Sequence, residues 1–275
     1  MKQKLLLFAA LAFIASAFFA CGNDSMKNDS AFVTESMTDS VESQIGGLNY
    51  WSAITMDFPT KGNPQLVRSI REWMADRAET SDSVDFASAT DFMKDFNRRN
   101  EEYFKKSYEE DYGGDDEDIP EDRNVNFSRC MEFEKIFEDD YFVTYLATED
   151  VYLNGAHGLY FVKGATFRKS DGRRFGFDML KDSSRDSIAT LITKNLEGNF
   201  NAKNFEELKE NLMLDEYESQ VPLPRNPPYL KSDTLMFVYQ QYEIAAYAYG
   251  LPEAAIPLKD LKGLLSPSFA KEIQP

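Results

Sequence analysis

The chain has 275 residues, of which 43% are hydrophobic and 14% aromatic, so it can bury a sizeable core and is not a disordered chain. Its 47 acidic and 30 basic residues give a formal net charge of −17, which repels phosphate backbones and excludes nucleic acid as a partner. One histidine and two cysteines are too few for zinc sites or a disulfide framework, so we predict no metal site built from these residues and no cofactor.

Residues 1–20 have the pattern of a secretory signal peptide. Lys2 and Lys4 precede an apolar run over residues 5–19, which is too short for a permanent span of a hydrocarbon core about 30 Å thick. A small residue directly before Cys21 resembles a bacterial lipobox, although Phe18 stands where leucine is usual. We therefore predict cleavage, lipidation at Cys21 and anchoring in a bacterial envelope, at the outer membrane or cell surface rather than the inner membrane. The alternative is an ordinary signal with a chance cysteine.

Removal of residues 1–20 takes away two lysines and lowers the net charge from −17 to −19. Residues 21–47 are rich in Ser, Asp, Asn and Glu, which predicts a disordered tether. A smaller α+β subdomain is expected over residues 48–123. It contains a strand near residues 49–58, a helix opened by Pro64 and a second helix that starts after Ser88 and reaches about Tyr108.

Residues 109–122 carry nine acids and no basic residue. Asp115 and Asp116 lie in this stretch. It has two alternative interpretations, a calcium-binding loop and a solvated acidic loop. The acids do not follow EF-hand spacing, which favours the solvated loop.

Residues 124–275 change from helical to alternating periodicity. Val125, Phe127, Met131, Phe133 and Phe137 fall on one side of a half-buried strand. The sequence predicts an α+β fold, in which an antiparallel sheet from residues 125–177 and 234–256 is covered on one face by helices near residues 188–212. Gly155, His157 and Gly158 belong to a predicted turn between two strands.

Two segments together resemble a known family. They are Asn154-Gly155-Ala156-His157-Gly158 and residues 237–250, which read Phe-Val-Tyr-Gln-Gln-Tyr-Glu-Ile-Ala-Ala-Tyr-Ala-Tyr-Gly. They resemble the RsiV-like extracellular domain of unknown function, shared by the anti-sigma factor RsiV and the deacetylase PdaC. The resemblance covers about residues 50–265, with Asn154 where glycine is common and Ala246 where proline is common.

This resemblance implies an α+β extracytoplasmic recognition domain, in at least one relative a receptor for lysozyme. The sequence shows neither the transmembrane helix of RsiV nor the catalytic domain of PdaC. Anti-sigma and deacetylase activities are therefore not implied.

The sequence offers little catalytic chemistry. His157 is the only side chain that ordinarily titrates near neutral pH, and small neighbours favour local packing in a turn over catalysis. Nucleophile-elbow, P-loop and dinucleotide motifs are absent, so we predict no catalytic residues and a non-enzymatic binding lipoprotein. A glycan hydrolase with a carboxylate pair and a purely structural envelope component are the alternatives.

The predicted partner is a cationic protein, with lysozyme as the named candidate, or a cell-wall glycan related to peptidoglycan. Tyr242, Tyr247 and Tyr249 would anchor it, since exposed aromatic side chains often dominate binding surfaces. Asp115 and Asp116 would mainly raise its association rate.

Overall fold

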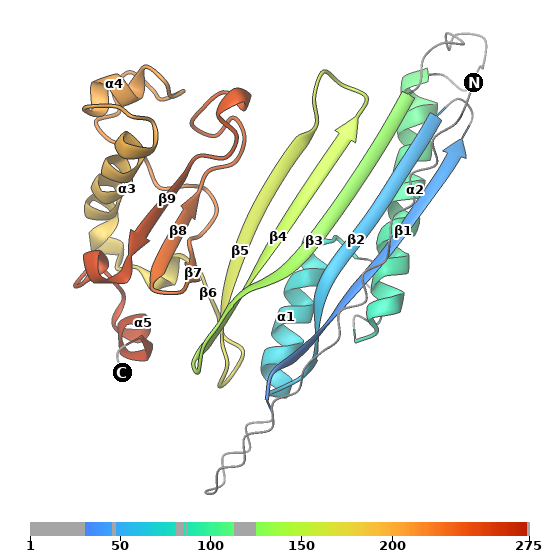
Figure 1. The fold of residues 1–275 in the computed structure, drawn as a ribbon, viewed down its shortest axis with the longest axis horizontal. Helices are drawn as coiled ribbons and strands as arrows, with labels where there is room; N and C mark the ends of the chain where they lie inside the picture. Colours follow the sequence, from blue (N-terminus) through green and yellow to red (C-terminus); the bar gives the residue numbers. More distant parts are fainter. Residues whose placement is uncertain (1–30, 46–47, 81–84, 86, 113–124, 274–275) are drawn as a thin grey trace, which may run out of the picture.

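The computed structural model describes residues 31–45, 48–80, 85, 87–112 and 125–273 (Figure 1). They form a six-stranded, mostly antiparallel sheet, a separate three-stranded sheet and five α-helices. The predicted α+β class is confirmed. The predicted lipidation site Cys21 and the acidic pair Asp115 and Asp116 lie outside the described residues.

The larger sheet has its strands in chain order across its width. They are β1 (Val33–Ile45), β2 (Leu48–Lys61), β3 (Val125–Glu138), β4 (Phe142–Leu153), β5 (Leu159–Arg168) and β6 (Arg174–Phe175). Only β2 and β3 pair in parallel, because the two helices α1 and α2 connect them, and every other neighbouring pair is antiparallel.

Two expectations about chain organisation differ from the structure. Residues 33–45 form β1, which pairs with β2 along its whole length, where the sequence predicted a tether. Few side chains of β1 are buried, so hydrogen bonding at the sheet edge orders a strand that hydropathy does not reveal. The predicted boundary between residues 123 and 124 does not divide the fold either, because β2 and β3 are neighbours in one sheet.

The helices α1 (Pro64–Arg77) and α2 (Ala89–Tyr112) pack on one face of this sheet (Figure 1). Asn63 caps α1 by accepting a hydrogen bond from the Gln65 amide, and Pro64 fits the first turn, as the sequence predicted. The helices bury apolar side chains against β2 to β5, which provides the main stabilisation of this half of the fold. The largest are Phe58, Trp73, Phe92, Phe96, Phe133, Tyr145 and Phe167.

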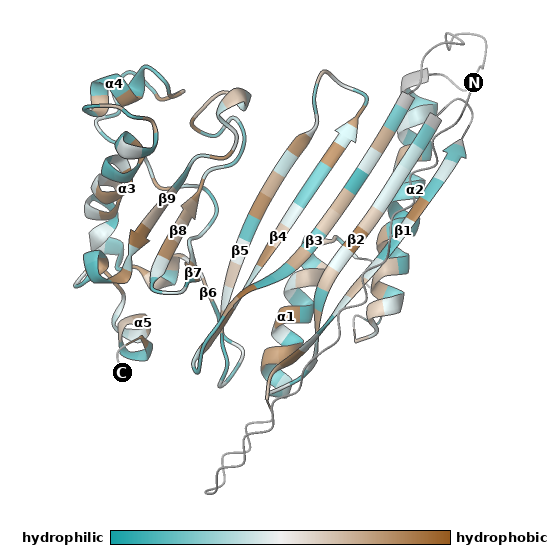
Figure 2. Ribbon diagram, viewed as in Figure 1, coloured by the Kyte–Doolittle hydropathy of each residue, from teal (hydrophilic) through white to brown (hydrophobic). Residues whose placement is uncertain are grey.

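The C-terminal third builds a second core around the smaller sheet. Its strands are β7 (Tyr229–Lys231), β8 (Thr234–Val238) and β9 (Glu253–Pro257), and its helices are α3 (Arg185–Asn199), α4 (Phe205–Lys209) and α5 (Pro267–Glu272). Short 3-10 turns are η2 (Phe177–Met179), η3 (Asp182–Ser184), η4 (Tyr247–Tyr249) and η5 (Leu258–Leu261). Figure 2 shows the hydrophobic residues concentrated on β8 and β9, which α3 covers.

The predicted single sheet was therefore wrong in its pairing. In residues 234–256, β8 pairs with β7 and β9 pairs with β8, and neither joins the strands of residues 125–177. The edge of β5 that could have accepted them is occupied by β6 and by the side chains of Gln240 and Gln241. The helices near residues 188–212 accordingly cover the smaller sheet.

A second difference concerns Phe137. A bulge between Lys135 and Phe137 breaks the alternation of β3, so Phe137 packs with the C-terminal core instead of following Phe133 toward the helices.

The two sheets meet at Gly164 on β5, on the face opposite α1 and α2. A Cβ atom added to Gly164 would lie 2.1 Å from Cδ1 of Tyr229, so only glycine permits this approach. Next to it, the Leu230 amide donates a hydrogen bond of 2.8 Å to the Thr166 hydroxyl. Val162, Tyr229, Met236 and Val238 form a small apolar cluster around this contact.

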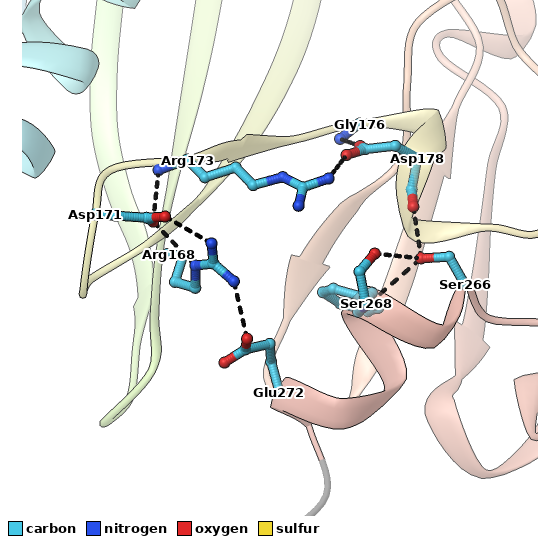
Figure 3. A network of polar contacts seen from close by, with 9 residues as sticks. Arg168, Asp171, Arg173, Gly176, Asp178, Ser266, Ser268 and Glu272 are labelled. Carbon is cyan, nitrogen blue, oxygen red and sulfur yellow. Dashed lines mark hydrogen bonds and ion pairs between the residues drawn. The ribbon is translucent and has the colours of Figure 1, made fainter.

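A polar network joins the β5–β6 turn to the C-terminal helix (Figure 3). The Arg168 guanidinium binds Asp171 on its own turn at 2.6 Å and Glu272 on α5 at 2.8 Å. The hydrogen bonds that Arg168 donates to Asp171 raise the pKa of Arg168 and lower the pKa of Asp171. The network fixes α5, and with it the C-terminal core, against the larger sheet.

Candidate functional site

Three residues singled out in the sequence meet on the surface. The His157 and Tyr247 rings are stacked, with centroids 3.9 Å apart and an interplanar angle of 23°. The Tyr242 hydroxyl lies 3.0 Å from Nε2 of His157, although 85 positions separate the two residues. We refer to His157, Tyr242 and Tyr247 as the aromatic cluster.

The predicted turn between β4 and β5 carries His157. Asn154 adopts a positive φ of 57°, which asparagine tolerates better than most residues. A Cβ atom on Gly158 would lie 3.2 Å from the Val151 carbonyl oxygen, so glycine lets the turn fold closely over β4. The turn therefore presents an exposed imidazole at the end of the sheet.

The loop after β8 carries the two tyrosines and is held against β5 by side chains. Gln240 accepts a hydrogen bond from the Val162 amide at 3.1 Å and donates to its carbonyl at 2.8 Å, as a neighbouring strand would. Gln241 accepts from the Tyr160 amide at 3.0 Å. Glu243 accepts from the amides of Gln240 and Arg225. Nothing in the sequence distinguished these glutamines from ordinary surface residues.

Tyr242 is held in an unfavourable backbone conformation. Its φ is 62°, in the left-handed region, where a bulky side chain costs about 1 kcal/mol or more. Its side chain is nevertheless 47% exposed. Backbone strain of this kind is concentrated at functional sites, which marks Tyr242 as a candidate contact residue.

The two hydrogen bonds of His157 define the tautomer of its neutral ring. Nδ1 lies 2.9 Å from the Gly158 carbonyl oxygen, which can only accept, so Nδ1 carries the proton. In the neutral ring Nε2 then accepts a hydrogen bond from the Tyr242 hydroxyl. Both nitrogens are engaged, so the arrangement fixes a flat, exposed aromatic surface.

Tyr249 lies apart from the aromatic cluster. Its hydroxyl donates to Oδ1 of Asn211 at 3.0 Å, and its ring packs at 5.3 Å from that of Phe200. Tyr247 and Tyr249 occupy the ends of the 3-10 turn η4, where residues two apart point in different directions. The structure thus unites two of the three predicted tyrosines with the predicted turn.

A polar cleft of about 560 Å³ lies between α2 and β4. Arg129 binds Glu149 at 2.6 Å and Glu79 at 3.6 Å, and donates to Asn100 at 3.2 Å. The side-chain amide of Asn100 in turn donates a hydrogen bond to the buried hydroxyl of Ser52 on β2. The two carboxylates share one guanidinium, which is an ion-pair cluster linked to a buried polar network.

The described residues hold no group of three or more His, Cys, Asp or Glu side chains that could bind a metal ion. Among the helices of this part of the chain, none is long and apolar enough to cross a membrane.

Comparisons with known proteins agree with this fold. The model of the family described as "Protein of unknown function (DUF3298)" matches residues 178–259. A crystal structure of a DUF3298 family member from Bacteroides fragilis is 18% identical, with a TM-score of 0.74 over 90% of this chain and 99% of that one. A DUF3298 family protein from Pseudomonas aeruginosa is 15% identical, with a TM-score of 0.58 over 88% and 97% of the two chains. The curated proteins gave no match. A DUF3298 domain is thus found at residues 178–259, within a fold that resembles solved members of that family.

Proposed function

We propose that this protein is a non-enzymatic binding lipoprotein of a bacterial envelope, anchored through Cys21, that recognises its ligand with the aromatic cluster. The observation that carries the proposal is the stacking of the exposed His157 on the half-buried Tyr247, completed by the exposed and strained Tyr242. Rigid aromatic side chains bury a large area at little entropic cost, which suits them as binding anchors. The resemblance of these same two segments to the RsiV-like domain supports this assignment.

The proposed partner is a cationic protein, with lysozyme as the first candidate. A net charge of −17, or −19 after removal of residues 1–20, attracts a basic protein over a distance of about 10 Å at moderate salt. Charge of this kind raises the association rate, whereas the aromatic cluster would slow dissociation. A glycan related to peptidoglycan is the second ligand class, because aromatic rings also stack on sugar rings. An outer-membrane or surface location would expose the site to both.

A glycan hydrolase remains the competing function. The observation in favour of a hydrolase is that Glu79 and Glu149 both line the polar cleft. Their shared bond to Arg129 weighs against it, since hydrolysis needs one carboxyl group to donate a proton.

Titration calorimetry of the mature chain in detergent micelles against lysozyme tests the proposal. Tyr247→Ala should weaken binding by about tenfold or more, because it removes the ring stacked on His157. Tyr217→Ala is the matched control, since Tyr217 is 90% exposed and outside the aromatic cluster. The proposal fails if no heat is detected at tens of micromolar protein, or if both variants change the affinity equally.

A further inference from the structure

A second cavity, of about 350 Å³, lies at the edge of β5, between Gln240 and β6. The end of α1 contributes Asp76 and Arg77 to its lining, β5 contributes Lys163, and β6 contributes Arg174. Pro227, from the loop before β7, also lines it. None of these residues belongs to the aromatic cluster.

The cavity has an excess of positive charge in a strongly acidic protein. Asp76 is bonded to Arg77 at 2.6 Å, and the other carboxylate of the lining, Asp178, is bonded to Arg173 at 2.7 Å. Among the described residues, no carboxylate lies within ion-pair distance of Lys163 or Arg174. The cavity therefore holds two cationic side chains without a paired anion.

The surroundings of Lys163 also indicate positive charge that no bound anion balances. Burial lowers the pKa of its ammonium group, and the positive charges of Arg77 and Arg174 lower it further, against the opposing effect of Asp76. Like charges are costly to hold together in a half-buried space. A bound anion would remove that cost.

A backbone donor also faces this space. The edge groups of Val162 are bonded to Gln240, and Thr166 pairs with Phe175 of β6. Because the edge-facing groups of a strand recur every second residue, the Gly164 amide between them points into the cavity.

An adjoining cavity of about 270 Å³ shares Arg77 and Lys163. Its apolar walls include Met131, Ala147 and Phe161, and its polar walls are Thr148, Asn226, Gln240 and Glu149, whose carboxylate is bonded to Arg129. Together the two spaces combine a cationic end with a partly apolar one.

We propose that this edge of β5 binds a small organic anion. Arg77, Lys163 and Arg174 hold its carboxylate or phosphate group, and an apolar portion lies against Ala147 and Phe161. The guanidinium groups and the ammonium provide charge-assisted hydrogen bonds to either kind of oxyanion.

Trp73 makes the site measurable. It lines the cationic cavity, and the chain has only one other tryptophan, the exposed Trp51 on β2. In the full chain carrying Trp51→Phe, tryptophan fluorescence therefore reports on the surroundings of Trp73 alone. The probes are 3-phenylpropionate, phenyl phosphate, inorganic phosphate and the neutral 3-phenylpropionamide.

We expect saturable quenching or enhancement with at least one of the two aromatic anions, and at least tenfold weaker binding of the neutral amide. The ratio between 3-phenylpropionate and phenyl phosphate distinguishes a carboxylate site from a phosphate site. Inorganic phosphate should bind more weakly than phenyl phosphate, because it leaves the apolar walls unfilled.

Lys163→Gln and Arg174→Gln should each weaken anion binding at least fivefold. Arg174 is exposed, so its replacement leaves the core intact, and Lys262→Gln is the control with the same change in charge at an exposed residue outside the cavity. Tyr247→Ala should leave the titration unchanged, which separates this site from the aromatic cluster. Equal binding of the amide and the anions, no saturation by 10 mM probe, or no effect of Arg174→Gln would overturn the proposal.

Discussion

Gly164→Ala tests how the two halves of the fold meet. The added Cβ atom would lie 2.1 Å from Cδ1, 2.2 Å from Cγ and 2.8 Å from Cβ of Tyr229. Carbon atoms in contact are ordinarily about 3.5–4.0 Å apart, so the Tyr229 ring must move by roughly 1.5 Å. Tyr229 is only 6% exposed and packs with Val162, Met236 and Val238, which leaves it little room.

The expected loss of stability follows from two opposing effects. Overpacking of a core contact costs about 1–3 kcal/mol. Alanine in a strand is favoured over glycine by about 0.5–1 kcal/mol, because glycine loses more backbone entropy on folding. The free energy of unfolding should therefore fall by up to about 2.5 kcal/mol, and by more if Tyr229 is expelled from its cluster.

Urea denaturation of four chains isolates the contact. The chains are the parent, Gly164→Ala, Tyr229→Ala and the double variant, which form a double-mutant cycle. Without the Tyr229 ring, Gly164→Ala should cost less than about 0.5 kcal/mol. Gly198→Ala in α3 is the control, since no atom lies within 4 Å of its added Cβ, and it should stabilise by about 0.5–1 kcal/mol. Equal costs of Gly164→Ala with and without Tyr229 would refute the proposed packing of the sheets.

Three further predictions concern pH, strain and anchoring. Burial raises the pKa of Tyr229 to about 12, so its contribution to stability is complete below about pH 10 and falls by about 2–3 kcal/mol as the pH rises to 12. Between pH 10 and 12, the urea midpoint of Tyr229→Phe should decline less steeply than that of the parent chain. An identical decline in the two chains would contradict this prediction. Tyr242→Asn relieves the strain of a positive φ, so the free energy of unfolding, measured by thermal denaturation, should change by less than about 1 kcal/mol. Lysozyme binding should nevertheless weaken tenfold. Unchanged binding would count against Tyr242 as a contact residue. Cys21→Ala should move the protein from the membrane fraction to the soluble one, and continued detergent partitioning would rule out a lipid anchor there.

The sequence predicted elements whose periodicity is strong. The helix opened by Pro64 and the alternating strand from Val125 combine clear hydrophobic patterns with local capping or turn signals. The strand β1 was not predicted, because its side chains are largely polar and hydrogen bonds to β2 order it. The pairing of β8 with β7 was not predictable either, since any edge offers the same backbone groups to a strand.

Candidate site residues were predicted one by one but not as a group. The turn around His157 and the tyrosines of residues 242–249 are visible as local patterns. Their contact depends on Gln240 and Gln241 covering the edge of β5, which no local signal indicates. The cationic cavity unites Arg77, Lys163 and Arg174 from three separate segments, so only the tertiary structure reveals it.

The most direct test of ligand recognition by the aromatic cluster uses the only histidine of the chain. In protein labelled with ¹⁵N-histidine, the ring signals come from His157 alone, whatever unlabelled partner is added. Lysozyme should shift or broaden these signals in a saturable way in the parent chain, and at least tenfold higher concentrations should be needed with Tyr247→Ala. Ring signals that stay unchanged while calorimetry detects saturated binding would contradict recognition through His157, Tyr242 and Tyr247.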